Sequence, residues 1–284
     1  MIENVADMLV EARRERYAVG AFNVMNLETT HAVLLAAKKI RVPVILQFTE
    51  STMRYIGGRA IFYTIKNLSE WYYPDVRVGI HLDHGKNIKV IQRCLEMGLP
   101  SVMFDGSRRD YEENIRLTAE VVRMGHNRGA SVQGELGSVP YSSEMKDIEI
   151  DWDKYMTDPD QARDFVARTG VNTLAVAIGN AHGLARERVT PDYDRLSRIV
   201  EKINIPIVMH GASDWEKDRV HEVVSRGVSC FNVDTNSRVA FAGSLSRAFQ
   251  KEIKLNTDLR QILGDARDTM QEAVEKKMRM FSME

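Results

Sequence analysis

The residues best suited to chemistry lie in one segment, Val78-Gly79-Ile80-His81-Leu82-Asp83-His84-Gly85. Its apolar, alternating first part predicts a buried strand. Charged groups and imidazole rings need partners when they are buried, so the end of a strand suits Asp83 and His84 better than its interior. There His84 can offer a neutral nitrogen to a metal, and Asp83 can move a proton beside it. The alternative is a hydrogen-bonded turn whose histidines have no chemical role.

Two further histidines, His182 and His210, follow predicted strands and precede glycine, as His84 does. Three imidazoles with an open position are typical of a catalytic zinc site. His81 shares a strand face with Asp83 and is interpreted as a hydrogen-bonded packing residue. Solvated rings are expected for the histidines in predicted helices: His31, His126 and His221.

Apolar segments and helical segments alternate eight times along the 284 residues. The predicted strands are 18–23, 42–48, 76–82, 101–104, 131–135, 173–178, 205–209 and 229–233. The predicted helices are 5–16, 27–39, 61–73, 88–97, 111–128, 159–169, 193–203 and 215–226, followed by 238–251 and 258–281. This alternation predicts a parallel sheet with crossover helices. Eight repeats favour a closed (β/α)8 TIM barrel, one α/β domain over 1–284 with a C-terminal helical extension. No GxGxxG follows the first strand, which argues against an open dinucleotide-binding sheet.

Each predicted strand ends at polar or metal-binding side chains: Asn23, Thr49, Asp83 with His84, Asp105 with Ser107, Glu135, His182, His210, and Asn232 with Asp234 and Thr235. Active sites of such barrels lie at the carboxyl ends of the strands. The convergence therefore predicts one site, although loops are polar in any case. Small and polar residues after the last strands favour a phosphate cradle over plain tight turns: Gly183, Gly211, Ser213, Asn232 and Thr235.

The overall composition excludes several classes of function. The net charge of −1, without a polybasic arm, argues against nucleic-acid binding. No apolar run approaches the roughly 20 residues of a membrane span, and the acidic start is unlike a signal peptide. Cys94 and Cys230 form no CxxC pair, so a reducing cytoplasm is expected rather than a disulfide framework.

The motifs HLDHG, DGS, GELG, GNAHG, HGAS and NVDT resemble, in order and spacing, the class II, zinc-dependent fructose-bisphosphate and ketose-bisphosphate aldolases. The opening AFNV and the closing ILGDARDTM and EKKMRMF extend this similarity over nearly the whole chain. The resemblance implies a barrel that forms homodimers or homotetramers, and a phosphorylated sugar as substrate.

The resemblance also implies roles for individual residues. His84, His182 and His210 would hold Zn²⁺, with Glu135 as a carboxylate near the metal. Asp83 would be the acid/base at the hydroxyl of the bond being broken, and Glu144 is the candidate for a second acid that protonates the enediolate carbon. The expected substrate-binding residues are Asn23, Thr49, Asp105, Ser107, Gly183, Gly211, Ser213, Asn232, Asp234, Thr235, Arg238 and Arg260.

Arg238 and Arg260 are the candidates that would bind the second phosphate of the substrate. The NVDTxxR pattern that ends at Arg238 resembles aldolases of fructose 1,6-bisphosphate in glycolysis. Asp258-Leu259-Arg260 resembles an Asp-Pro-Arg segment that reaches a neighbouring subunit's site. The chain departs from the family pattern at Thr49, Arg108, 139–143, 184–186 and Asp214.

Other functions stay open at this point. One is an aldolase for tagatose 1,6-bisphosphate or a catabolic deoxy-sugar phosphate. Others are a metal-dependent barrel hydrolase and a non-catalytic sugar-phosphate-binding relative. Another divalent metal, cobalt or iron, and a requirement for a monovalent cation also stay open.

Overall fold

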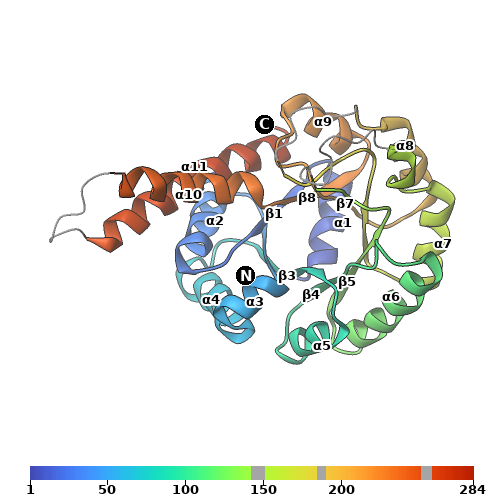
Figure 1. Cartoon of the computed structure of the whole chain (residues 1–284), viewed down its shortest axis with the longest axis horizontal. Helices are drawn as coiled ribbons and strands as arrows, with labels where there is room; N and C mark the ends of the chain where they lie inside the picture. The colour runs from blue at the N-terminus through green and yellow to red at the C-terminus, as the bar shows by residue number, and fades with distance from the viewer. Residues whose placement is uncertain (142–150, 184–189, 251–257) are drawn as a thin grey trace.

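The structure, a computed structural model, describes residues 1–141, 151–183, 190–250 and 258–284. Eight parallel strands form a closed barrel in chain order, with helices around it (Figure 1). The predicted α/β class and (β/α)8 barrel are therefore confirmed. The strands are β1 (Val19–Asn23), β2 (Val44–Thr49), β3 (Val78–Gly85), β4 (Ser101–Phe104), β5 (Ser131–Leu136), β6 (Thr173–Val176), β7 (Ile207–Met209) and β8 (Val228–Val233).

The strand register places polar residues of neighbouring strands side by side. Asn23 at the end of β1 pairs with Gln47 of β2, and Thr49 pairs with Asp83 of β3. Ala21 of β1 is level with Asn232 of β8 where the barrel closes. Parallel strands all end at the same rim, so these polar side chains meet there.

Helices connect the strands and cover the barrel. The described α-helices are α1 (Val5–Glu15), α2 (Leu27–Ile40), α3 (Glu50–Ile56), α4 (Gly58–Asn67), α5 (Ile88–Glu96), α6 (Tyr111–His126), α7 (Pro159–Thr169), α8 (Tyr193–Lys202), α9 (Lys217–Ser225), α10 (Thr235–Phe249) and α11 (Leu259–Phe281). Leu68–Tyr72 adds a π-helical turn, and Trp152–Lys154 adds a 3₁₀ turn.

Local sequence signals set several of the helix ends. The Asn26 side chain accepts from the Thr29 N–H, and the Thr29 hydroxyl accepts from the Asn26 N–H, which completes a capping box on α2. Asp158 caps α7, which begins with Pro159, and Gly170 ends it in the left-handed conformation. These side chains satisfy backbone groups that have no partner within the helix.

The structure differs from the sequence-based prediction around β2. Because Pro43 has no N–H to donate, β2 begins at Val44 rather than at residue 42. The sequence predicted no helix over 50–56, yet α3 forms there behind a Thr49 cap and buries none of its residues. Without a buried face α3 has no apolar periodicity to detect. Gly57, at φ 92°, separates it from α4.

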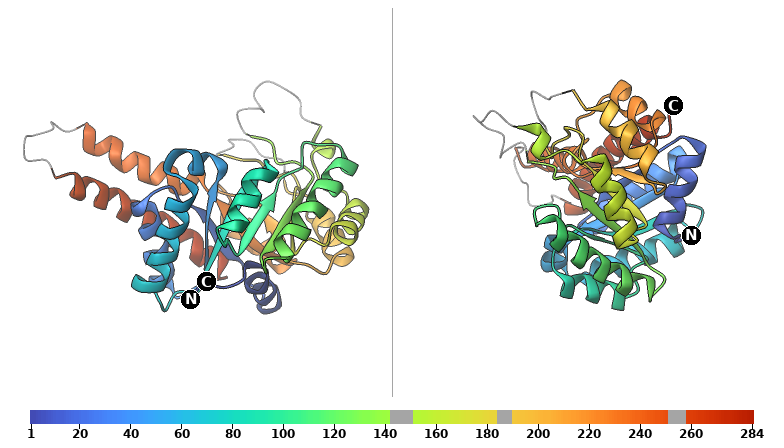
Figure 2. Two further views of the ribbon diagram at one scale, coloured as in Figure 1. Left: turned by 90° about the horizontal axis from the view of Figure 1, so that it is seen from below. Right: turned by 90° about the vertical axis from the view of Figure 1, so that its right-hand side faces the viewer.

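The last two helices form an antiparallel pair that extends beyond the barrel, coloured orange to red in Figure 1 and in the left view of Figure 2. Towards its C-terminal end α11 packs on α2 and α9. A stripe of buried residues at a spacing of three to four explains this packing: Ala266, Met270, Val274, Met278 and Phe281. The Phe281 carbonyl accepts from the Ala18 N–H, so α11 ends beside the start of β1.

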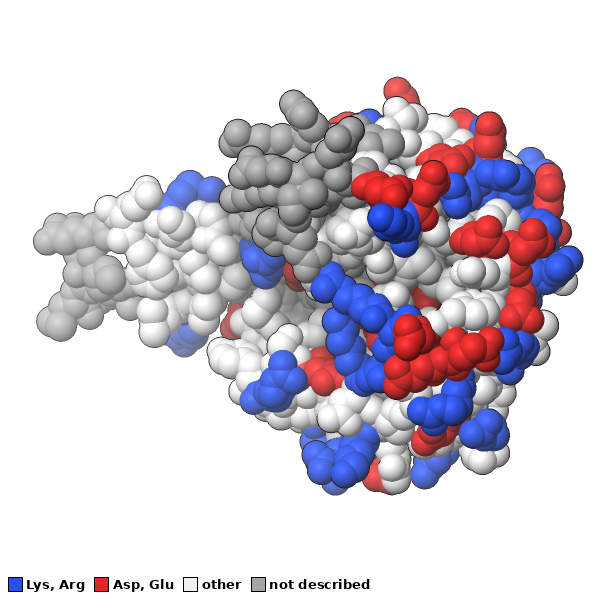
Figure 3. Space-filling model, turned by 45° about the vertical axis from the view of Figure 1, so that its right-hand side comes forward, with Lys and Arg blue, Asp and Glu red and all other residues white. Residues whose placement is uncertain are grey.

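The hydrophobicity of the helices, the surface charges and the cysteines agree with what the composition predicted. In the described part of the chain, no helix is both long and apolar enough to span a bilayer. Lys and Arg lie beside Asp and Glu over the face drawn in Figure 3. Cys94 and Cys230 are both buried and free.

Candidate metal centre and active site

The backbone of β3 turns His84 towards the centre of the rim. The pairing between β3 and β4 is irregular between Leu82 and Gly85, and His84 has a φ of 47°. A left-handed conformation is uncommon for a residue with a Cβ and marks local strain at functional sites. At Gly85 an added Cβ would lie 2.4 Å from the Met103 carbonyl oxygen, so β3 can approach β4 this closely only with glycine there.

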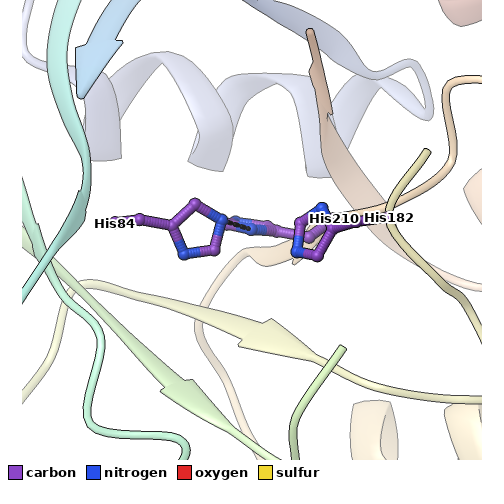
Figure 4. A group of neighbouring side chains, drawn as sticks. All are labelled: His84, His182 and His210. Atoms are coloured by element: carbon purple, nitrogen blue, oxygen red, sulfur yellow. Dashed lines mark hydrogen bonds between the residues drawn. The ribbon is translucent and has the colours of Figure 1, made fainter. Parts of the chain in front are cut away.

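The three predicted metal-binding histidines come together (Figure 4). One ring nitrogen of each of His84, His182 and His210 lies within 4.8 Å of the other two. His182 is held from the β5 side, because its N–H donates to the Pro140 carbonyl at 2.8 Å. The turn after His210 needs glycine: Gly211 has a φ of 62°, and a Cβ there would lie 2.5 Å from the backbone of Ala181.

The hydrogen bonds around these rings direct one nitrogen of His84 towards one nitrogen of His210. The Asp105 carboxylate lies 2.9 Å from His84 Nδ1, and the side-chain amide oxygen of Gln133, Oε1, lies 3.2 Å from His210 Nε2. If each ring donates to that acceptor, His84 Nε2 and His210 Nδ1 carry no proton, yet they face each other at 3.0 Å. A proton on either nitrogen lets one ring donate to the other, and a divalent metal ion can take the place of that proton. The donor set therefore fits a divalent metal ion.

Two carboxylates lie beside the histidines. Glu135 Oε2 is 3.8 Å from His84 Nδ1 and 3.9 Å from His210 Nδ1, and it has no hydrogen-bond partner in the described part of the chain. Burial, together with the charge of Asp105, raises the pKa of Glu135 to about 8. Burial opposes the charged form of His84, but Asp83 and the hydrogen bond to Asp105 raise its pKa to about 9. His84, Asp105 and Glu135 form a second group that could hold a metal.

Asp83 lies next to the histidines and is fixed by two amides. Asn23 donates to its Oδ2 at 2.9 Å, and Asn232 donates to its Oδ1 at 3.1 Å. Burial opposes the charge of Asp83, but His84, His210 and the Asn23 hydrogen bond together hold its pKa below the usual value. Asp83 is thus an oriented, ionised carboxylate that can accept a proton.

A cavity of about 750 Å³ opens beside Asp83 and the histidines. Its lining contains most of the predicted substrate-binding residues: Asn23, Thr49, Gly183, Gly211, Ser213, Asn232, Asp234, Thr235 and Arg238. The Arg238 guanidinium lies 3.2 Å from the carboxylate of Asp234, the N-cap residue of α10.

Three of the predicted substrate-binding residues do not line this cavity: Asp105, Ser107 and Arg260. Ser107 donates to Asp105, and Asp105 contacts His84, so both lie behind the His84 ring rather than in the pocket wall as expected. Arg260 is paired with Asp258 at the start of α11, and its side chain is 92% exposed. Glu144 lies outside the described residues.

Several residues of the site were missed by the sequence analysis. Gln47 donates to Asn23 at 2.8 Å, and Asn180 donates to the His210 carbonyl at 2.8 Å. Tyr141 stacks on His182, with ring centroids 4.9 Å apart. Gln133 was detectable in principle, because it lies two residues before Glu135 and therefore on the same strand face.

The remaining histidines agree only in part with the prediction. His81 is buried and its Nδ1 lies 2.8 Å from the Ser101 hydroxyl, which agrees with a packing role. His126 is exposed. His31 and His221 are half-buried rather than solvated, and His31 contacts the Tyr73 hydroxyl at 2.7 Å.

Comparison with known proteins agrees with this geometry. The family model described as "Fructose-bisphosphate aldolase class-II" matches residues 3–284. A fructose-bisphosphate aldolase of Geobacillus stearothermophilus is 36% identical, with 98% of this chain and 96% of the relative covered. A D-tagatose-1,6-bisphosphate aldolase subunit, GatY, of Klebsiella oxytoca is also 36% identical, with the same coverage. The crystal structure of the YdjI aldolase from Escherichia coli K12 superimposes with a TM-score of 0.87 at 28% identity, covering 99% of this chain and 97% of that one. The chain therefore belongs to the class-II fructose-bisphosphate aldolase family and is an aldolase, a carbon–carbon lyase.

Proposed function

We propose that this aldolase reversibly cleaves fructose 1,6-bisphosphate to dihydroxyacetone phosphate and glyceraldehyde 3-phosphate, with a zinc ion held by His84, His182 and His210. One observation supports this most strongly. Asp83 is fixed by two amides directly beside three converging imidazoles, at the edge of a cavity large enough for a sugar phosphate. Imidazole ligands favour zinc, while cobalt or iron could occupy the same donor set.

A divalent metal held by these histidines supplies Lewis-acid stabilisation of the negative charge that remains when a ketose is cleaved between C3 and C4. Asp83 accepts the proton of the C4 hydroxyl as the aldehyde departs. Asn23 and Asn232 keep both carboxylate oxygens of Asp83 in place for that transfer. Glu135 serves as an additional carboxylate near the metal. Glu144 stays the candidate for the acid that protonates the enediolate carbon.

The dihydroxyacetone-phosphate half would lie against the turns that follow β6, β7 and β8. These turns contribute glycine and hydroxyl groups to the cavity lining, which supports a phosphate cradle. The residues proposed for it are Gly183, Gly211, Ser213, Asn232, Asp234 and Thr235. A monovalent cation is a further proposed requirement of the enzyme.

The second phosphate needs cationic groups, and Arg238 lies in the cavity lining for this role. We propose Arg260 of a second copy as the other. Its exposure at the start of α11, in a helical pair that extends beyond the barrel, supports a contribution to a neighbouring site. The protein would then be a homodimer or a homotetramer. It would act on a small phosphorylated sugar in glycolysis, in a reducing cytoplasm where Cys94 and Cys230 stay free.

Tagatose 1,6-bisphosphate is the alternative substrate, favoured by the identity to the tagatose-bisphosphate aldolase subunit. Parallel measurement of kcat/KM decides between them, with the metal-loaded enzyme acting on each bisphosphate and on a deoxy-sugar phosphate. The proposal expects fructose 1,6-bisphosphate to give the highest value. Equal or higher kcat/KM on another ketose phosphate would overturn the substrate assignment, and tight binding without turnover would indicate a non-catalytic relative.

A further inference from the structure

A lysine is buried behind the turn that follows β7. Lys277 lies on α11 and is 5% exposed, although lysine is among the side chains least often buried in proteins. Its ammonium donates to the Trp215 carbonyl at 2.8 Å. Burying an ammonium group is costly unless it has a polar partner, so the Trp215 carbonyl offsets part of the cost of burying Lys277.

Trp215 closes the turn that supplies cavity-lining residues. Its N–H donates to the Ala212 carbonyl at 3.1 Å, which closes the turn directly behind Ser213. Gly211 and Ser213 line the cavity on the other side of this turn. The Trp215 side chain is 1% exposed and packs against Phe231 of β8. Trp215 thus fixes the turn in two ways: its ring packs on β8, and its carbonyl accepts the hydrogen bond from Lys277 of α11.

Lys277 also faces the acidic groups of this turn. Asp214 and Glu216 flank Trp215, and the charge of both favours the ammonium form of Lys277. Burial is the larger influence and lowers the pKa of Lys277, and the neighbouring Lys276 acts in the same direction. Two carboxylates beside a phosphate site would repel a phosphate dianion, and a buried ammonium beside them offsets that charge.

We propose that Lys277 is a positioning residue for substrate phosphate: its ammonium fixes the turn 211–215 through the Trp215 carbonyl and offsets the acidic groups beside it. The inference rests on the proposed function, since it requires that this turn holds the dihydroxyacetone-phosphate half. Lys277 touches neither the cavity nor the histidines, so it acts through the shape and the potential of the turn.

The test is the affinity of the metal-loaded enzyme for dihydroxyacetone phosphate, measured by calorimetry. Lys277→Met should raise the Kd about tenfold, because it removes a hydrogen bond and a compensating charge. Lys277→Arg keeps the charge and a donor, and should recover most of the affinity. Lys276→Met is the matched control: it removes an exposed lysine from the adjacent position of α11 and should leave the Kd unchanged.

Metal content and thermal unfolding separate this role from general destabilisation. All variants should bind the same amount of metal per chain. If folded Lys277→Met has a Kd within twofold of that of Lys276→Met, the role of Lys277 is overturned and the proposed function is not affected. No binding of dihydroxyacetone phosphate by the unaltered enzyme would overturn both this role and the proposed function. If Lys277→Met does not fold, Lys277→Gln takes its place: its amide can still donate but carries no charge, so an unchanged Kd would refute the charge offset.

Discussion

Gln47 is connected to the proposed base through one intermediate side chain. It donates to Asn23, and Asn23 donates to Asp83. Gln47 is fully buried and is not among the residues that line the cavity. Gln47→Met keeps the length and most of the volume of the side chain but removes the amide. We expect it to lower kcat with little change in KM, because substrate does not contact position 47.

The magnitude follows from the acceptor that Gln47→Met leaves without a partner. An unpartnered buried carbonyl costs about 1–3 kcal/mol, which is the upper limit for the half-buried Asn23 side chain. Asn23 can avoid this cost by rotating, but it then loses its hydrogen bond to Asp83. If about 1.4 kcal/mol of that cost appears in the transition state, kcat falls about tenfold, and the full range sets an upper limit of roughly 150-fold. The free energy of unfolding should change little, because Gln47 Oε1 has no hydrogen-bond partner in the described part of the chain and its removal offsets part of the loss.

The loss of kcat in Gln47→Met should also depend on pH. The hydrogen bond from Asn23 helps to hold the pKa of Asp83 below its usual value. Losing it raises that pKa, so Asp83 becomes protonated at a higher pH and the acid limb of the kcat profile moves upwards. Triose phosphate release, followed across pH with matched metal content, measures both effects. Ser229→Ala is the control, because it removes a buried hydroxyl of β8 that bonds to Gly227 instead. If kcat of Gln47→Met stays within twofold and the acid limb does not move, the Gln47–Asn23–Asp83 chain has no catalytic role.

Three further predictions test the metal centre and the pocket. Asp83→Ala should lower kcat by about 10²–10⁴-fold at unchanged metal content, since general-base catalysis contributes this much; a loss below about tenfold would refute its role. Arg238→Ala should raise KM for a bisphosphate more than for the corresponding monophosphate, and an equal rise for both would show that Arg238 does not face the second phosphate. The metal-free protein holds a proton at His84 up to about pH 9, so metal must displace it. Zinc affinity measured against a competing chelator should therefore increase as the pH rises towards about 9, whereas an affinity independent of pH would contradict metal binding by the neutral His84 ring.

The sequence predicted those parts of the site that stand out from an apolar strand. Asp83, His84 and His210 each follow an apolar run, so they appear as polar groups at strand ends. Strand order then places them at one rim, because parallel strands of a barrel all end on the same side. The barrel and the three converging histidines could therefore be predicted from the sequence alone.

Other parts depend on contacts that no local pattern encodes. Gln47 and Gln133 are single polar residues inside apolar strands, and only the closed barrel shows which partners they meet. Asp105 appeared as one more polar strand end, and its contact with His84 depends on the irregular pairing of β3 and β4. Tyr141 lies in an aperiodic segment, and its stacking on His182 joins residues 41 positions apart.

The most direct test of the account is triose phosphate release from fructose 1,6-bisphosphate by the enzyme before and after treatment with a chelator, and after zinc is restored. The account predicts turnover that chelation abolishes and zinc restores. Turnover that persists in protein shown to contain no metal would contradict the metal centre at His84, His182 and His210. No turnover by fully metal-loaded, folded protein would contradict fructose 1,6-bisphosphate as the substrate.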